Sequence, residues 1–175
     1  LERLPTTEKY FSVQNFIFLD RDGVLNEKML KAEYVVSWDK WKWKSGALEG
    51  LKLLKKKNIK VIIITNQAGV SREKMTKTDL DKIHSRMLED IRSSGGDIEK
   101  IYACTCNWDD NCDCRKPKPG MLFQAQYDFD FIMEKTYFIG DDERDNLAAE
   151  EAGCKPILIK GNDRLDNIVK QLFYR

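Results

Sequence analysis

Residues 16–26 read Phe-Ile-Phe-Leu-Asp-Arg-Asp-Gly-Val-Leu-Asn, an apolar run that ends in two acids. Four consecutive apolar residues predict a short, fully buried strand. Asp20 closes this strand, and Asp22 follows two residues later. In a regular strand their carboxylates would point to opposite faces, but Gly23 lets the backbone turn so that both can converge. Crowding two like charges costs stability without a cation, so the pair indicates chemistry rather than packing.

The rest of the chain alternates strand patterns with helical patterns. We expect further strands at 59–65, 98–103, 136–140 and 155–160, and helices at 46–57, 76–92, from 119 to about 127, near 144–152 and from about 163. Thr76 with Asp79 three residues later is a helix-capping pattern, and Asn58 is a plausible helix stop. The alternation predicts an α/β fold, a three-layer Rossmann-like sandwich with a parallel central sheet. We interpret residues 1–175 as one domain with an N-terminal extension at 1–15.

Polar residues stand where three of the expected strands end. They are Asp20 and Asp22, Thr65 and Asn66, and Asp141 and Asp142. In parallel sheets, chemistry gathers at the carboxyl ends of the strands. One carboxylate can attack phosphorus, and a second can protonate the leaving oxygen and later deprotonate water. Oxygen ligands of this kind suit magnesium, which would shield a phosphate from the acids.

At four ordered motifs the sequence resembles the haloacid dehalogenase superfamily of phosphatases. They are Asp20-Arg-Asp-Gly-Val-Leu-Asn26, Thr65 after an apolar strand, Lys116 in Cys114-Arg-Lys-Pro-Lys-Pro-Gly-Met121, and Gly140-Asp-Asp-Glu-Arg-Asp145. The resemblance implies that Asp20 is the nucleophile and Asp22 the general acid and base. It implies that Thr65 holds the phosphoryl group and that Lys116 neutralises charge. Magnesium would be bound by Asp20, by Asp22 through its backbone carbonyl, and by Asp141, with Asp142 or Asp145 in support.

Four of the five cysteines crowd into residues 104–114. Cys104, Cys106, Cys112 and Cys114 form two Cys-x-Cys units separated by five residues. Four thiolates on a short loop can close a tetrahedral zinc site, and we expect this zinc to be structural. Disulfides or free thiols are the alternative. Cys154 lies apart and reads as a packed small hydrophobic residue.

The cysteine loop and the motif after it narrow the resemblance. A zinc loop before Cys-Arg-Lys-Pro, without a large cap domain, is similar to D-glycero-D-manno-heptose-1,7-bisphosphate 7-phosphatases and to related histidinol-phosphatases. The likeness extends from Phe16 to about Ile159. It implies removal of the 7-phosphate of the heptose in bacterial surface-polysaccharide biosynthesis, with substrate-binding residues Asn26, Asn66, Arg72 and Arg115. Two residues depart from the pattern: Cys106 replaces the usual His, and Glu73 replaces the Gly that usually follows Arg72.

Composition excludes some classes of function. The formal net charge is +1, which argues against a dedicated nucleic-acid binder. No apolar run approaches the ~18 residues of a membrane span, and residues 1–10 lack a signal-peptide pattern. We expect a cytoplasmic monomer that binds a small phosphorylated sugar and neither nucleic acid nor membrane. Because the chain has no initiator Met, it can also be part of a longer bifunctional chain.

Several alternatives remain open from the sequence. A histidinol-phosphate phosphatase or another small sugar-phosphate phosphatase would use the same acids, and so would a DNA 3′-phosphatase. A non-catalytic zinc-binding scaffold would not need them. Trp38, Trp41 and Trp43 could stack on a sugar, although we favour packing of Trp41 and Trp43 onto the core. His84 is the only histidine, and we interpret it as structural.

Overall fold

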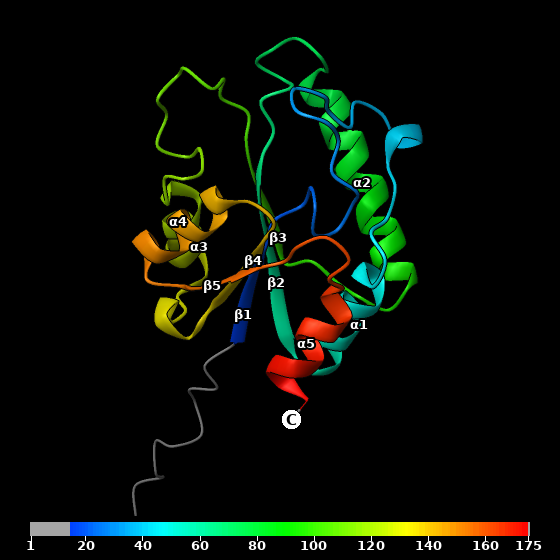
Figure 1. Ribbon diagram of the computed structural model, residues 1–175, viewed down its shortest axis with the longest axis vertical. Helices are drawn as coiled ribbons and strands as arrows, with labels where there is room; N and C mark the ends of the chain where they lie inside the picture. The colour runs from blue at the N-terminus through cyan, green and yellow to red at the C-terminus, as the bar shows by residue number, and fades with distance from the viewer. Residues whose placement is uncertain (1–14, 175) are drawn as a thin grey trace, which may run out of the picture.

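A computed structural model describes residues 15–174, and its centre is a five-stranded sheet (Figure 1). The strands are β1 (Asn15–Leu19), β2 (Ile59–Asn66), β3 (Lys100–Cys104), β4 (Tyr137–Gly140) and β5 (Lys155–Leu158). They are ordered β3-β2-β1-β4-β5, and every neighbouring pair is parallel. Each strand lies within two residues of its predicted bounds at either end.

Helices cover both faces of the sheet. They are α1 (Ala47–Lys56), α2 (Lys77–Ser93), α3 (Gly120–Phe129), α4 (Glu143–Ala152) and α5 (Leu165–Phe173), with short 3-10 turns η2 (Trp38–Lys40) and η3 (Met133–Lys135). In Figure 1, α3 and α4 lie on one side of the sheet, and α1, α2 and α5 lie on the other. The predicted three-layer α/β sandwich is confirmed.

Alternation along β1 shows how the sequence builds these layers. Phe16 and Phe18 belong to the apolar cluster under α3 and α4, whereas Ile17 and Leu19 belong to the larger cluster under α1, α2 and α5. Successive side chains of a strand point to opposite faces, so one uninterrupted apolar run supplies both cores. This double burial fixes β1 at the centre of the sheet.

Local signals place the helices that flank the site. Thr76 and Asp79 form the predicted capping box at the start of α2. Asn58 follows the end of α1 in the left-handed region, at φ 54°, which asparagine tolerates better than most residues. These boundaries follow from short-range chemistry, and so they could be predicted.

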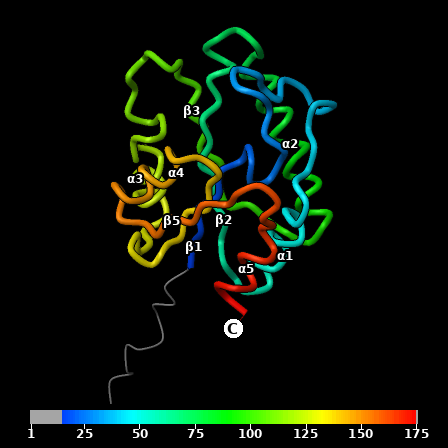
Figure 2. The backbone as a smooth tube through the Cα atoms, viewed as in Figure 1, coloured from blue at the N-terminus to red at the C-terminus, as the bar shows by residue number. Residues whose placement is uncertain are grey.

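The order of the strands determines where the site lies. The chain runs from β1 outward to β2 and β3, and then returns to the other side of β1 with β4. The strand order therefore reverses between β1 and β4. Ligands of parallel sheets bind at such a reversal, outside the carboxyl ends of the strands. Figure 2 shows the loops after β1, β2 and β3 gathered at that end of the molecule. Within residues 15–174 no connection folds into a large cap domain.

The N-terminal extension expected at 1–15 falls almost wholly outside the described residues, and Asn15 already belongs to β1. Among the described helices, none is both long and apolar enough to cross a membrane.

Candidate active site

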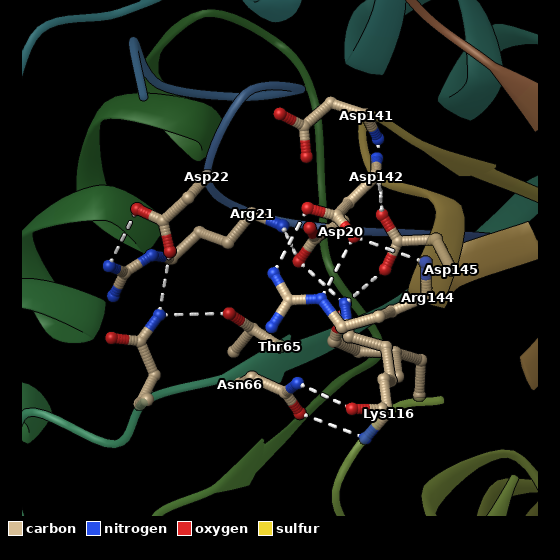
Figure 3. Close-up of polar contacts among 12 residues, drawn as sticks. Asp20, Arg21, Asp22, Thr65, Asn66, Lys116, Asp141, Asp142, Arg144 and Asp145 are labelled. Atoms are coloured by element: carbon tan, nitrogen blue, oxygen red, sulfur yellow. Dashed lines mark hydrogen bonds and ion pairs between the residues drawn. The ribbon is translucent and has the colours of Figure 1, made fainter. Parts of the chain in front are cut away.

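Asp20 and Lys116 form the buried centre of the site (Figure 3). Asp20 directly follows β1, and its backbone N–H donates to the carbonyl of Ile139 in β4 at 3.0 Å. Lys116 enters from the segment before α3, where its ammonium lies 2.9 Å from Oδ1 of Asp20 and donates to the carbonyl of Ile64 at 2.9 Å. The Lys116 side chain is 3% exposed. The ends of β1, β2 and β4 therefore converge on the Asp20–Lys116 pair.

Asp145 is the second anionic partner of Lys116, at 2.6 Å from its ammonium. Its other oxygen accepts hydrogen bonds from the backbone N–H groups of Asp141 and Asp142, both at 3.1 Å. Asp142 caps α4, and Asp145 completes the capping box. One acid thus closes the helix terminus and holds the lysine.

Burial has a large effect on the protonation of Asp20. Burial, and then the neighbouring Asp145 carboxylate, raise the pKa of Asp20 to about 8. Burial would by itself lower the pKa of Lys116, but the carboxylates of Asp20 and Asp145 outweigh it and raise that pKa. A carboxylate that attacks phosphorus must be ionised, so the centre needs more positive charge than Lys116 alone supplies.

The carboxylates of Asp20, Asp141 and Asp145 fit a divalent cation. Oxygens from the three lie within 4.8 Å of one another. Asp145 has both oxygens occupied, whereas Oδ1 of Asp141 is buried and has no partner within residues 15–174. Gly23 approaches so closely that a Cβ there would lie 2.2 Å from Oδ2 of Asp141. A hard oxygen-only donor set of this kind suits magnesium, with Asp20 and Asp141 the side chains free to bind it.

Asp22 lies beside this centre, but its carboxylate turns toward other residues. It receives hydrogen bonds from Arg21 at 2.9 Å, Asn26 at 2.9 Å and Gln67 at 2.8 Å. Burial would raise the pKa of Asp22, but the Arg21 guanidinium and these hydrogen bonds outweigh it and lower the pKa. Asp22 is therefore held as a carboxylate in this arrangement, ready to accept a proton.

Asn26, an expected substrate contact, lies in a buried position beside Asp22. The residue is 0% exposed, and its side-chain N–H groups donate to Asp22 and to the carbonyl of Glu27. It does not line the cavity of the site. Asn26 therefore orients Asp22.

Thr65 and Asn66 end β2, as the sequence predicts. Thr65 is fully buried, and its hydroxyl accepts a hydrogen bond from Gln67 at 2.8 Å, which leaves the hydroxyl proton for another acceptor. Asn66 exchanges two 3.1 Å hydrogen bonds with the backbone of Lys116. Asn66 thus fixes the segment that carries the lysine, in addition to lining the cavity.

A cavity of about 780 Å³ opens over the acids. Its lining includes both acidic motifs and a set of cationic side chains: Lys28, Lys31, Arg115, Lys116, Lys118 and Arg144. Nη1 of Arg115 is buried and has no partner among the described residues. This mixture of a buried acidic centre and a cationic wall suits an anionic ligand.

Lys28 and Arg144 are site residues that the sequence interpretation missed. Lys28 donates to Asp141 at 2.7 Å and to Asp142 at 3.3 Å. Arg144 donates two hydrogen bonds to the carboxylate of Asp142. These hydrogen bonds lower the pKa of Asp142. Arg144 lies inside the fourth motif, so its position two residues after Asp142 was an available signal. Lys28 comes from a loop, and nothing in its neighbourhood in sequence indicates the contact.

Arg72 stands at the edge of the cavity rather than in its lining. Its guanidinium lies 4.2 Å from the ring centre of Trp108, which belongs to the cysteine loop and lines the cavity. Trp38, Trp41 and Trp43 pack against one another, with centroids 5.0 and 5.2 Å apart, and none of them lines the cavity. Packing, the favoured interpretation for Trp41 and Trp43, is confirmed.

The four loop cysteines come together next to the site. Three Sγ–Sγ distances lie between 3.5 and 3.7 Å, and Cys114 lies 2.6 Å from Cys104. Tetrahedral zinc with Zn–S bonds of about 2.3 Å places sulfurs about 3.8 Å apart. None of the five cysteines forms a disulfide. The cluster is compatible with a zinc site.

Comparison with known proteins identifies the family. A profile of the polynucleotide kinase 3 phosphatase family matches residues 15–153. A D-glycero-β-D-manno-heptose-1,7-bisphosphate 7-phosphatase of Neisseria meningitidis is 36% identical over 82% of this chain and 75% of that protein. The chain belongs to the haloacid dehalogenase phosphatases.

Two further members of the haloacid dehalogenase phosphatases support the assignment. The D-glycero-β-D-manno-heptose-1,7-bisphosphate 7-phosphatase of Pseudomonas aeruginosa is 33% identical over 91% of this chain and 88% of that protein. The crystal structure of a D,D-heptose 1,7-bisphosphate phosphatase from B. bronchiseptica, complexed with magnesium and phosphate, has a TM-score of 0.87 and 31% identity. That likeness covers 91% of this chain and 98% of the other. The chain is thus a phosphatase, and the expected enzyme class is confirmed.

Proposed function

We propose that this phosphatase removes the 7-phosphate of D-glycero-D-manno-heptose 1,7-bisphosphate through a phosphoryl group carried on Asp20. The observation that carries the chemistry is the convergence of Asp20 and Lys116, 2.9 Å apart, at the base of a cavity of about 780 Å³. The choice of substrate is supported by the likeness to heptose bisphosphate phosphatases over 91% of the chain.

The first step is transfer to the enzyme. Asp22, a carboxylate before the substrate binds, first takes the proton of the phosphate monoanion. The Asp20 carboxylate attacks phosphorus, the bond between phosphorus and the sugar oxygen breaks, and that oxygen takes this proton from Asp22. The Lys116 ammonium beside Asp20 offsets the negative charge of the phosphoryl oxygens. A magnesium ion held by Asp20, Asp141 and the backbone carbonyl of Asp22 would supply further positive charge.

The second step releases phosphate. Asp22, now a carboxylate, takes a proton from water, and the water oxygen attacks phosphorus so that its bond to Asp20 breaks. The three hydrogen bonds that hold Asp22 in the carboxylate form suit this role. Thr65 and backbone N–H groups at the end of β2 would orient the phosphoryl oxygens.

A second anionic group fits the cationic wall of the cavity. Arg115 lines it with an Nη1 that has no partner in the described part of the chain, and Lys118 lies three residues further on. Such a group is present in a bisphosphate, where one phosphate would lie over Asp20 and the other against Arg115. Zinc on the four loop cysteines would keep this part of the wall in place, as a structural ion.

A DNA 3′-phosphatase is the second candidate, because the matching family profile is described as polynucleotide kinase 3 phosphatase. The balanced charge of the chain argues against it. Histidinol phosphate is a third candidate, and Glu73 beside Arg72 could face its amine.

The test is phosphate release with magnesium from four esters: the two anomers of heptose 1,7-bisphosphate, histidinol phosphate and a 3′-phosphorylated oligonucleotide. We expect a preference for one heptose anomer of at least about a hundredfold in kcat/KM. Asp20→Asn should abolish turnover of every ester without changing the fold. Equal or better cleavage of the oligonucleotide, with a steep dependence on salt, would replace the proposed substrate.

A further inference from the structure

Arg21 is a buried cation that links the site to α2. Its side chain is 1% exposed. Nη2 donates to Oδ1 of Asp22 at 2.9 Å, and Nη1 donates to Nε2 of His84 at 3.2 Å. The guanidinium carbon lies 5.6 Å from the ring centre of Trp41. One end of Arg21 therefore holds a residue of the proposed reaction, and the other end holds a histidine that the reaction does not use.

The chemistry of this contact determines the state of His84. A guanidinium has donors only, so Nε2 of His84 must be the acceptor and cannot carry a proton. Burial, and then the charge of Arg21, lower the pKa of His84 to about 4. His84 is therefore a neutral imidazole with its proton on Nδ1. It presents a lone pair to Arg21 from the buried face of α2.

Arg21 has few other constraints. Among the described residues, its guanidinium donates to the side chains of Asp22 and His84, and its Nε atom has no partner. A long side chain held at only one end loses its fixed geometry. Without His84, Asp22 would be the one hydrogen-bond partner left to the guanidinium among the described residues, with the Trp41 ring as its other contact, and Asp22 would lose a rigid neighbour at Oδ1.

We propose that His84 is a positioning residue for phosphoryl transfer: through the Arg21 guanidinium it fixes the direction of the Asp22 carboxyl group, which passes the proton it has taken from the bound phosphate to the leaving oxygen. The inference rests on the proposed function, in which Asp22 is the general acid. His84 does not line the cavity, so it acts through Arg21 and not by contact with substrate.

This role makes a prediction that a purely structural role does not. A sugar alkoxide leaves only when its oxygen is protonated, whereas p-nitrophenolate is stable as an anion and leaves without help. Loss of the general acid therefore slows alkyl phosphates much more than p-nitrophenyl phosphate. The ratio kcat/KM isolates the steps up to the first phosphoryl transfer, so the later hydrolysis does not obscure the comparison.

The experiment compares wild type, His84→Leu, His84→Gln and His84→Asn with magnesium on heptose 1,7-bisphosphate and on p-nitrophenyl phosphate. We expect His84→Leu to lose about tenfold or more in kcat/KM on the sugar phosphate and about twofold or less on the aryl phosphate. His84→Gln, whose amide oxygen can reach Arg21, should keep the wild-type ratio between the substrates. His84→Asn is too short and should behave like His84→Leu.

Coupling through Arg21 is tested by combining variants. In an Arg21→Met background, adding His84→Leu should cause no further loss, because the two residues act through one contact. Equal fractional losses on both substrates, or a full additional loss in the Arg21→Met background, would overturn the proposal. If His84→Leu does not fold, the proposal is tested by comparing His84→Gln with His84→Asn, and equal ratios between the two substrates in these variants would overturn it. A wild type inactive on the heptose overturns only the proposed substrate, and glucose 6-phosphate then replaces it as the alkyl ester.

Discussion

The ammonium of Lys116 lies 2.9 Å from Oδ1 of Asp20, and both groups are almost entirely removed from solvent. Asp145 holds the same ammonium from the other side, at 2.6 Å. The lysine is therefore fixed before any ligand enters, and a phosphoryl group that reaches Asp20 also reaches Lys116. Preorganised charge of this kind needs no rearrangement during the reaction.

Lys116→Met should remove both activity and stability. It leaves two buried carboxylates without their cation, and breaking a buried pair costs roughly 3–5 kcal/mol of unfolding free energy. We expect a fall in kcat of at least about a hundredfold and a clear drop in midpoint on urea denaturation. Lys77→Met is the matched control, because Lys77 is exposed on α2, is paired with the exposed Asp81 and does not line the cavity. An active, fully stable Lys116→Met protein would contradict the central role of this lysine.

Gly23→Ala should damage the site through a steric clash. Gly23 has φ 85°, and an added Cβ would lie 2.2 Å from Oδ2 of Asp141. Gly153 has nearly the same φ, 84°, but a Cβ there would meet nothing within 4 Å. Both variants should lose about 1 kcal/mol of stability from backbone strain. Only Gly23→Ala should also lose activity, measured as kcat/KM with saturating magnesium; equal activity in both would argue against the close approach of Gly23 to Asp141.

The positions of the acids could be predicted because they depend on local pattern. Asp20, Thr65 and Asp141 each follow an apolar run, and parallel strands bring such ends to one edge. The same holds for the capping box of Thr76 and Asp79 at the start of α2. In these cases a few neighbouring residues, together with the rule that parallel strands end at one edge of the sheet, are enough to predict where the side chain lies.

The direction of side chains after the strand ends could not be predicted. Asn26 follows Asp22 closely in sequence and was expected at the substrate, yet it is buried and donates to Asp22. Gln67 and His84 reach the same network from β2 and α2 across long separations. Such contacts depend on three-dimensional packing, for which a single sequence holds no periodic signal.

Lys28→Met should strengthen magnesium binding. Lys28 donates to Oδ2 of Asp141 at 2.7 Å, so its ammonium competes with a divalent cation for that carboxylate. Loss of one partly exposed charge should tighten binding by about threefold to tenfold. Calorimetric titration of magnesium without substrate measures this directly. Lys31→Met, from the same loop, should change the affinity less, and weaker binding in Lys28→Met would contradict the competition.

Cys106→Ser tests the zinc site. Three of the Sγ–Sγ distances, between 3.5 and 3.7 Å, already lie close to the spacing of tetrahedral zinc, and removal of one thiolate should lower the metal affinity strongly. We expect about one zinc per chain in the wild type, measured by plasma mass spectrometry, and a large decrease in the variant. Cys154→Ala is the control, because Cys154 is buried beside Met133 and away from the loop.

The kinetic effect of Cys106→Ser follows from what holds the neighbouring residues. Asn66 binds both backbone groups of Lys116, so the lysine should stay in place when the loop loosens. Arg115 and Trp108 have no comparable anchor in that loop, and both line the cavity. The variant should therefore raise KM more than it lowers kcat, and it should melt at a lower temperature. Unchanged zinc content would overturn the four-thiolate site, and a loss confined to kcat would show that the loop also controls the position of Lys116.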